Sequence, residues 1–269
     1  MSRYNISSGV QSLYANLSLL HSLVVRDIAA RYRGTMLGFV WVLVYPLMML
    51  GVYSFVFGRV FNARWGSGGD IQDFVPMLYC GLIVHALFSE TLTRSPAAIL
   101  SNPGYVKKVV FPLELLPVSH LVSAMFNALI GLLLIGIFLL VRHQTIPATV
   151  LYVPLVFFPL LLLTAGLAWF LSAVGIFFRD LGQMMGVAMS VLLFLSPVFY
   201  PISSVPLLVQ KLIYLNPLTY PVEALRAALI SGVQPDWSHW LAYSVVSLLM
   251  AVGGLWVFQK TRPAFADVI

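Results

Sequence analysis

The chain has 269 residues, of which 60% are apolar and 9% charged, and its mean hydropathy is +0.95. A soluble domain carries charges on roughly a quarter of its residues, so this composition excludes a soluble globular protein and indicates a polytopic, all-α membrane protein. The net charge of +6 comes from basic residues in short flanks beside apolar runs. That distribution fits membrane topology better than a nucleic-acid-binding face.

The N-terminal residues 11–33 have the pattern of an amphipathic helix and not that of a membrane span. Apolar residues recur at helical spacing and would form one stripe; they are Leu13, Leu17, Leu20, Val24 and Ile28. We expect an N-terminal unit, 1–35, whose helix lies in the cytoplasmic membrane interface. The alternative is a helix that packs on another subunit.

The first span follows a basic cluster made of Arg26, Arg31 and Arg33. An uncharged run of about 25 residues then continues to Arg59, long enough to cross the ~30 Å hydrocarbon core as a helix. The basic flank predicts that the N-terminus stays in the cytoplasm.

The first span also carries an aromatic face. Trp41, Tyr45 and Phe55 fall on one side of a helix by their spacing, and Tyr45 and Phe55 lie toward the middle of the run. Aromatic belts for lipid would cluster at both interfaces instead. The face therefore either walls a conduit for sugar rings or packs against neighbouring helices.

Six apolar runs of spanning length are predicted. They cover 36–58, 73–93, 118–141, 149–177, 183–200 and 237–258, and the fifth is short and interrupted near its end by Pro197 and Pro201. Ten basic residues lie in the segments that would face the cytoplasm and five in the outer segments. This asymmetry predicts both termini inside and an even number of spans.

The inner segment 94–117 contains helix start and stop signals that a simple loop between two spans would not need. Pro103 would start a short helix, which Pro112 ends, with Lys107 and Lys108 beside an apolar tip. Such a helix could insert into a groove of a cytoplasmic partner or merely anchor the loop in the interface. Just before it, Glu90 and Arg94 stand four residues apart and are expected to pair.

In the outer segment 201–236, Pro201, Pro206, Pro217 and Pro221 interrupt two moderately apolar pieces, each too short to span. Two short helices that dip into the outer leaflet and return fit this pattern. Because irregular backbone is tolerated at membrane depth only where protein or a water-filled cavity surrounds it, this hairpin is a candidate part of a transport pathway.

Motifs for catalysis and nucleotide binding are absent from the sequence. It has no GxxxxGK[ST] loop, no GxSxG elbow and no histidine or cysteine pair at metal-ligand spacing. If ATP powers this protein, a separate chain must bind it. A membrane glycosyltransferase or ligase would need clustered acids in the outer loops, and a secondary carrier would be expected to show repeats or acids at the membrane midplane. Both remain as weaker alternatives.

Five segments together resemble ABC-2-type permeases that export polysaccharides, the O-antigen and teichoic acid branch. They are RDIAARYRGTMLGFVWVLVYPLMMLGVYSFVFGRVF, SNPGYVKKVVFPLELLP, FFRDLGQ, LSPVFYPISSVP and LNPLTYPVEALRAALISG, in chain order over nearly the whole sequence. The resemblance implies a transmembrane domain over 36–269 that forms a homodimer and binds two copies of a separate ATPase, which holds ATP and magnesium. The substrate would be a polyprenyl-pyrophosphate-linked glycan, moved outward through the bacterial inner membrane. O-antigen is the expected glycan, with teichoic acid or capsule as alternatives.

The resemblance also assigns roles to residues. The helix that couples to the ATPase would contain Asn102, Pro103, Lys107, Lys108, Phe111 and Pro112, and a second, smaller contact would use Phe178, Arg179 and Asp180. The outer gate would contain Ser196, Pro197, Tyr200, Asn216, Pro217, Tyr220 and Arg226. The pyrophosphate head would enter beside Arg26, Arg31 and Arg33, and the polymer would pass Trp41, Tyr45 and Phe55. No cofactor is expected in this chain itself.

Overall fold

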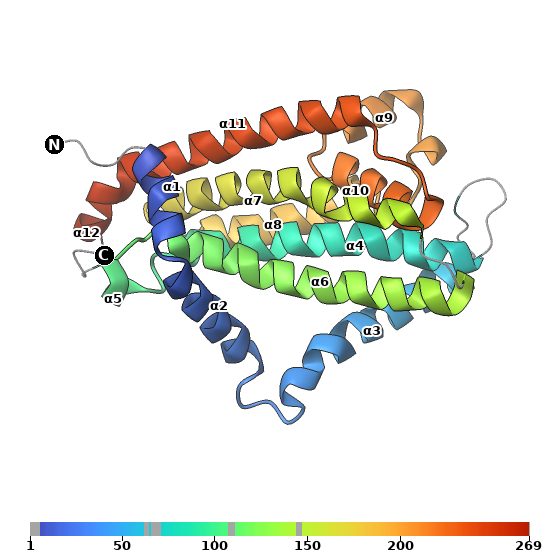
Figure 1. Cartoon of the computed structure of the whole chain (residues 1–269), viewed down its shortest axis with the longest axis horizontal. Helices are drawn as coiled ribbons and strands as arrows, with labels where there is room; N and C mark the ends of the chain where they lie inside the picture. The colour runs from blue at the N-terminus through green and yellow to red at the C-terminus, as the bar shows by residue number, and fades with distance from the viewer. Residues whose placement is uncertain (1–5, 62–64, 66–70, 107–110, 144–146, 269) are drawn as a thin grey trace.

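A computed structural model describes residues 6–61, 65, 71–106, 111–143 and 147–268. These residues form a bundle of helices whose long members run side by side (Figure 1). The N-terminal helix α1 (Ile6–Ala15) and the C-terminal turn α12 (Phe265–Val268) lie at one end of the bundle, and α9 (Leu207–Tyr214) lies at the opposite end (Figure 1). We call the end at α1 the inner end of the bundle and the end at α9 the outer end, after the orientation that the sequence predicts.

Five helical segments of the described chain are long and apolar enough to cross a membrane. They are Gly38–Val60, Phe74–Ala97, Leu115–Val141, Ala148–Gly175 and Trp237–Ala264. The predicted fifth run instead forms α8 (Leu181–Leu195), whose 15 residues reach about 22 Å at helical rise. The helix ends before 200 because Ser196 precedes Pro197, and its extended backbone (ψ 151°) is the conformation that a following proline imposes.

The long helices are bounded as follows: α3 Trp41–Tyr53, α4 Ile71–Arg94, α6 Leu115–His143, α7 Val153–Gly175 and α11 Trp237–Thr261. A widened π turn, Ser54–Val60, extends α3 toward its outer end. Helix α4 is central, since it packs on α6, α8 and α10 (Thr219–Arg226). Within α4 the single cysteine, Cys80, is fully buried.

The first span is packed far less than α4. In its most apolar stretch 6% of the residues are buried, against 67% in α4. Figure 1 shows the reason: α2 (Leu17–Tyr32) and α3 diverge from the bundle as the two arms of a V. Large side chains of α3, including Tyr45 and Met48, are therefore exposed in the single chain.

The closest helix crossing joins α7 and α11. A Cβ atom added to Gly254 would lie 1.9 Å from the carbonyl oxygen of Gly166, so only glycine allows the two backbones to touch here. GxxxG spacings in the sequence would also allow a close approach at Gly34/Gly38 and at Gly182/Gly186, but nothing within the described chain lies within 4 Å of a Cβ at any of these positions. The close crossing therefore uses one glycine from each of two distant helices.

The N-terminal segment corrects one detail of the sequence prediction. The expected single helix over 11–33 is two helices, α1 and α2, that meet at Asn16, whose side-chain amide donates to the carbonyl of Ser12 at 2.8 Å. The apolar stripe is also shifted: Leu23 and Val24 are buried, whereas Leu17 is 56% exposed. The break lets α1 pack on α11 while α2 packs on α6.

The outer segment forms the two short helices that the prolines predict. Helix α9 starts directly after Pro206, and α10 continues into a π turn, Ala227–Ser231, that ends at Gly232 with φ +65°. Helix α10 is largely buried against α4 and α7, while α9 is mostly exposed. At the inner end, the single turn α5, Pro103–Val106, begins the predicted coupling segment, residues 102–112.

Candidate functional site

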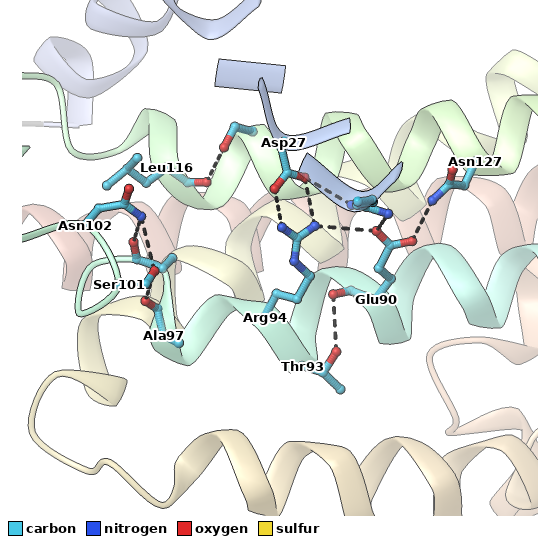
Figure 2. A network of polar contacts seen from close by, with 12 residues as sticks. Asp27, Glu90, Thr93, Arg94, Ala97, Ser101, Asn102, Leu116 and Asn127 are labelled. Carbon is cyan, nitrogen blue, oxygen red and sulfur yellow. Dashed lines mark hydrogen bonds and ion pairs between the residues drawn. The ribbon is translucent and has the colours of Figure 1, made fainter. Parts of the chain in front are cut away.

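The inner ends of α2, α4 and α6 share a network of charged side chains (Figure 2). Asp27 of α2 accepts hydrogen bonds from both terminal nitrogens of Arg94 in α4, with Nη1 at 2.9 Å, and from Nη2 of Arg31 at 3.1 Å. Arg31 also forms an ion pair with Glu90, which lies 3.6 Å from Arg94. On the far side, Asn127 of α6 donates to Glu90 at 3.0 Å. The predicted pairing of Glu90 with Arg94 is confirmed as one edge of this network.

The network is balanced in charge and partly shielded from solvent. Its two carboxylates face two guanidinium groups, and the four side chains are 17–32% exposed. Burial alone would raise the pKa of Asp27, but the hydrogen bonds and the positive charge of Arg94 outweigh it and hold that pKa well below its usual range. Asp27 is therefore a stable anion that fastens the interface helix to the second span.

A cavity of about 630 Å³ opens beside this network. Arg31, Glu90 and Asn127 border it at one end, and its remaining walls are mostly apolar. From the first span it is lined by Trp41, Val42, Tyr45, Pro46, Met49 and Tyr53. The structure thus brings two of the three expected conduit aromatics to one cavity.

Phe55 lies apart from that cavity. It is 62% exposed and sits in the π turn beyond α3, outside the lining. The lining face of α3 follows the four-residue spacing from Tyr45 through Met49 to Tyr53, which turns away from Phe55. The sequence prediction grouped Phe55 with Trp41 because it assumed that residues of one helix face recur at alternating intervals of four and three residues.

The three arginines of the basic cluster have separate surroundings. Arg31 belongs to the network and borders the cavity, as described above. Arg26 donates from Nη1 to the hydroxyl of Tyr105 at 2.6 Å, and its guanidinium carbon lies 5.5 Å from that ring's centre. Arg33 caps the C-terminal end of α2 and is exposed. Only Arg31 borders the cavity.

The coupling segment is held together by an aromatic stack. The rings of Tyr105 and Phe111 lie 4.2 Å apart and within 16° of parallel. Before Pro103, the side-chain amide of Asn102 donates to the carbonyl of Ala98 at 3.0 Å. Pro112 is buried. The expected residues Lys107 and Lys108 lie outside the part of the chain that the structure describes, so the predicted helix is described only for its first turn.

A buried ion pair stands directly behind the coupling segment. The side chain of Glu114 is 2% exposed, and its Oε2 accepts from Arg262 Nη1 at 3.0 Å. Arg262 also donates from Nη2 to the carbonyl of Phe111 at 2.9 Å. From α7, the indole of Trp169 donates to the carbonyl of Glu114 at 3.1 Å. Sequence reasoning missed this pair; the signal was a lone acid in an otherwise apolar run.

The second inner loop connects α7 with α8 at the same end of the bundle as α5. Phe178 is 66% exposed, and Arg179 and Asp180 are exposed beside it. The loop follows Gly175, where an added Cβ would lie 2.4 Å from the carbonyl oxygen of Pro96. The two inner loops therefore leave the bundle next to each other, and the expected contact residues of the second loop face solvent.

At the outer end, Arg226 of α10 binds several backbone carbonyls. Its Nε donates to Met77 of α4 at 2.8 Å, and its terminal nitrogens donate to Pro197 at 2.7 Å and Val198 at 3.0 Å. Nη1 also pairs with Glu223 at 2.8 Å. The Arg226 side chain is only 3% exposed, and these hydrogen-bond acceptors compensate its charge in place of water.

The remaining residues of the predicted gate have other partners. Asn216 donates to the hydroxyl of Ser196 at 2.9 Å and accepts from the backbone of Leu218, next to Pro217. Tyr200 lies near the end of α8, with its hydroxyl 3.3 Å from the carbonyl of Phe194. Tyr220 packs against Tyr243 of α11, with ring centres 5.3 Å apart and the planes tilted by 40°. Most of these residues thus join the outer helices to the end of α8 or to α11.

Trp65 is a further residue that sequence reasoning missed. The centre of its ring lies 4.2 Å from the guanidinium carbon of Arg226 and 5.7 Å from the centre of the Phe74 ring, which is tilted by 56°. The loop that carries it precedes α4, so nothing in its sequence spacing points to α10. Among the residues that the structure describes, no group of three His, Cys, Asp or Glu side chains could hold a metal ion.

Comparison with known proteins identifies the relatives of this chain. Residues 18–230 match the family described as ABC-2 type transporter. The chain is 29% identical over 262 residues to an O-antigen export system permease protein, RfbA, of Myxococcus xanthus, covering 97% of this chain and 98% of the relative. It is 25% identical to the polysialic acid transport protein KpsM of Escherichia coli (79% and 81% covered). It is also 22% identical to the capsule polysaccharide export inner-membrane protein CtrC of Neisseria meningitidis (97% and 98% covered).

Proposed function

The chain belongs to the ABC-2 type transporter family, and from that premise we propose that it exports a polyprenyl-pyrophosphate-linked polysaccharide, specifically O-antigen. It is the membrane permease of such a transporter, and ATP binding belongs to a separate ATPase. The observation that carries the proposal is the similarity to an O-antigen permease across 97% of this chain and 98% of that relative. The similarity to the polysialic acid transporter covers less of both chains.

The working unit in this proposal is a homodimer with two copies of the ATPase. The weak packing of the first span supports it, because the exposed face of α3 in the single chain suits burial against a second copy. Six spans with both termini in the cytoplasm complete the arrangement, with α8 as the short fifth span. The coupling segment, including Asn102, Phe111 and Pro112, would contact the ATPase together with Phe178, Arg179 and Asp180.

The path of the substrate would begin at the inner end of the cavity. The pyrophosphate head would enter beside Arg26, Arg31 and Arg33. Arg31 could exchange its contact with Glu90 for a phosphate group, whose oxygens can accept two parallel hydrogen bonds from arginine. The glycan would then pass the aromatic side chains of Trp41 and Tyr45, which border the cavity. The outer gate would comprise the α8 end and the α9–α10 hairpin that Arg226 joins.

A deletion strain of the native bacterium tests the glycan. If the proposal is correct, undecaprenyl-linked glycan accumulates inside the cell and the surface loses O-antigen alone, and a plasmid copy of the gene restores it. Loss of capsule with intact O-antigen would instead support the second candidate, capsule export, which the similarity to the capsule protein favours.

Purification of the tagged permease tests the class of transporter. The ATPase subunit should copurify with it, and the purified complex should hydrolyse ATP. A permease that exports glycan without any bound ATPase would contradict the proposal and favour a secondary carrier.

A further inference from the structure

A charged side chain just after helix α11 of the last span contacts the end of the coupling segment. Helix α11 ends at Thr261, and Arg262 opens the following turn. From there its guanidinium reaches back 148 residues along the chain to Glu114, at 3.0 Å, and 151 residues to the carbonyl of Phe111, at 2.9 Å. Two parallel donations from one planar group fix both the distance and the orientation of the segment.

Because Glu114 is buried, the removal of Arg262 alone would be energetically costly. The side chains of Glu114 and Arg262 are 2% and 19% exposed. A buried carboxylate without its cation is strongly destabilising, while well-packed apolar residues in place of both are often neutral. A bundle that needed only stability at this point could therefore use an apolar pair. The ion pair differs from an apolar pair because it fixes a specific geometry between the coupling segment and the end of α11.

The same residue is also held from α7. Trp169 donates to the backbone carbonyl of Glu114 at 3.1 Å. Helices α7 and α11 touch at Gly166 and Gly254 through their backbones and pack closely along each other. Glu114 is thus the point at which a displacement of the coupling segment reaches two long helices at once.

We propose that Arg262 is a positioning residue for energy coupling: through Glu114 and the carbonyl of Phe111, it transmits movement of the coupling segment to the α7–α11 pair. The inference rests on the proposed function, since it requires an ATPase that moves this segment. It assigns to Arg262 a role in the efficiency of transport, separate from binding of either ATP or glycan.

The chain offers a matched control two residues earlier. Lys260 is also basic and lies at the same end of α11, but it is exposed, with its Nζ 4.8 Å from the ring centre of Trp256. K260Q and R262Q each remove one positive charge from the same end of the bundle, but the contact of Lys260 is with Trp256 and not with the coupling segment. Any effect of net charge on membrane insertion or ATPase binding should appear equally in K260Q and R262Q.

The test uses the full complex with its ATPase, in cells and in vesicles, and measures glycan export and ATP hydrolysis in the same preparations. In R262Q we expect export per ATP hydrolysed to fall about tenfold, within the usual range of coupling factors, while the ATPase stays bound and active. R262K should recover part of this ratio, because an ammonium can pair with Glu114 but cannot make the forked contact. K260Q should match the wild type.

A wild-type ratio in R262Q would overturn the inference, and so would a parallel loss of ATPase binding and hydrolysis. Should R262Q fail to fold, the neutral pair R262Q/E114Q removes the unpaired buried charge, and the same ratio is measured there. Failure of the wild-type complex to bind an ATPase or to export glycan would refute the proposed function instead. The two failures are therefore distinguishable.

Discussion

The two ends of the bundle use arginine in opposite ways. At the inner end, Arg31 and Arg94 share two carboxylates, Asp27 and Glu90, so each cation has more than one anionic partner. At the outer end, Arg226 is almost completely buried and donates mainly to backbone carbonyls. Carboxylate partners can be exchanged by rotation of a side chain, whereas carbonyl partners are fixed by the fold. The inner end is thus suited to rearrangement and the outer end to rigidity.

The largest effect is expected from R226M, which removes the donor from three carbonyls of α4 and the α8 end. We expect a loss of about 3–5 kcal/mol in stability, as for other broken buried charge contacts. Thermal unfolding of the detergent-solubilised protein measures it. The control is E223Q: the Glu223 side chain is 43% exposed, so its loss should lower the unfolding temperature only slightly. Equal losses in both variants would show that the outer contact depends on the ion pair and not on the carbonyls.

The second prediction concerns Asp27 and Arg94. D27N and R94Q should each cost about 1–3 kcal/mol, because each removes a charge-assisted contact that is only partly buried. The double variant should cost less than the sum of the two, since the residues are in direct contact. A double-mutant cycle by thermal unfolding gives the coupling. Strict additivity would mean that Arg31 and Glu90 replace the lost partners fully.

The pH dependence sharpens the same comparison. The pKa of Asp27 is lowered in the folded protein, so its contribution is fully present above the pKa of the unfolded chain and declines as pH falls toward the folded value. The stability difference between wild type and D27N should stay constant from neutral pH to about pH 5 and shrink below that. Unfolding temperatures at a series of pH values test it. A difference that grows on acidification would have the wrong sign.

The smallest effect is expected from W65L. Trp65 covers the guanidinium of Arg226 at 4.2 Å, and such a cation–π contact contributes about 0.5–2 kcal/mol. The loss should therefore be well below that of R226M, because the carbonyl contacts remain. W237L, which alters a tryptophan that contacts Tyr152 instead, serves as the control. If W65L were as destabilising as R226M, the ring and not the carbonyls would hold Arg226.

Local features of this chain were predictable from sequence because they depend on nearby residues. The long apolar runs, the helix start at Pro103, the two short helices after Pro206 and the pairing of Glu90 with Arg94 all follow from composition or from four-residue spacing. The failures have a local cause too. The residue pattern placed the end of the fifth run at 200, but the conformation that Pro197 imposes on Ser196 ends the helix earlier.

Contacts between distant segments were not predictable in the same way. Asp27 meets Arg94 across 67 residues, and Glu114 meets Arg262 across 148. Helical periodicity gives the face of each residue but not which helix lies opposite. The glycine crossing illustrates this: GxxxG spacings occur at Gly34/Gly38 and at Gly182/Gly186, whereas the backbones meet at Gly166 and Gly254, in two separate helices.

Cys80 has a practical consequence for experiments on this protein. It is the only cysteine of the chain, and its side chain is fully buried in α4. Thiol reagents need an accessible thiolate, so the folded native protein should not react with maleimides. Cysteines introduced one at a time at α9, at Phe178 or at α1 could then be labelled from either side of the membrane without replacing Cys80. The wild-type sequence is already the background for mapping its own topology.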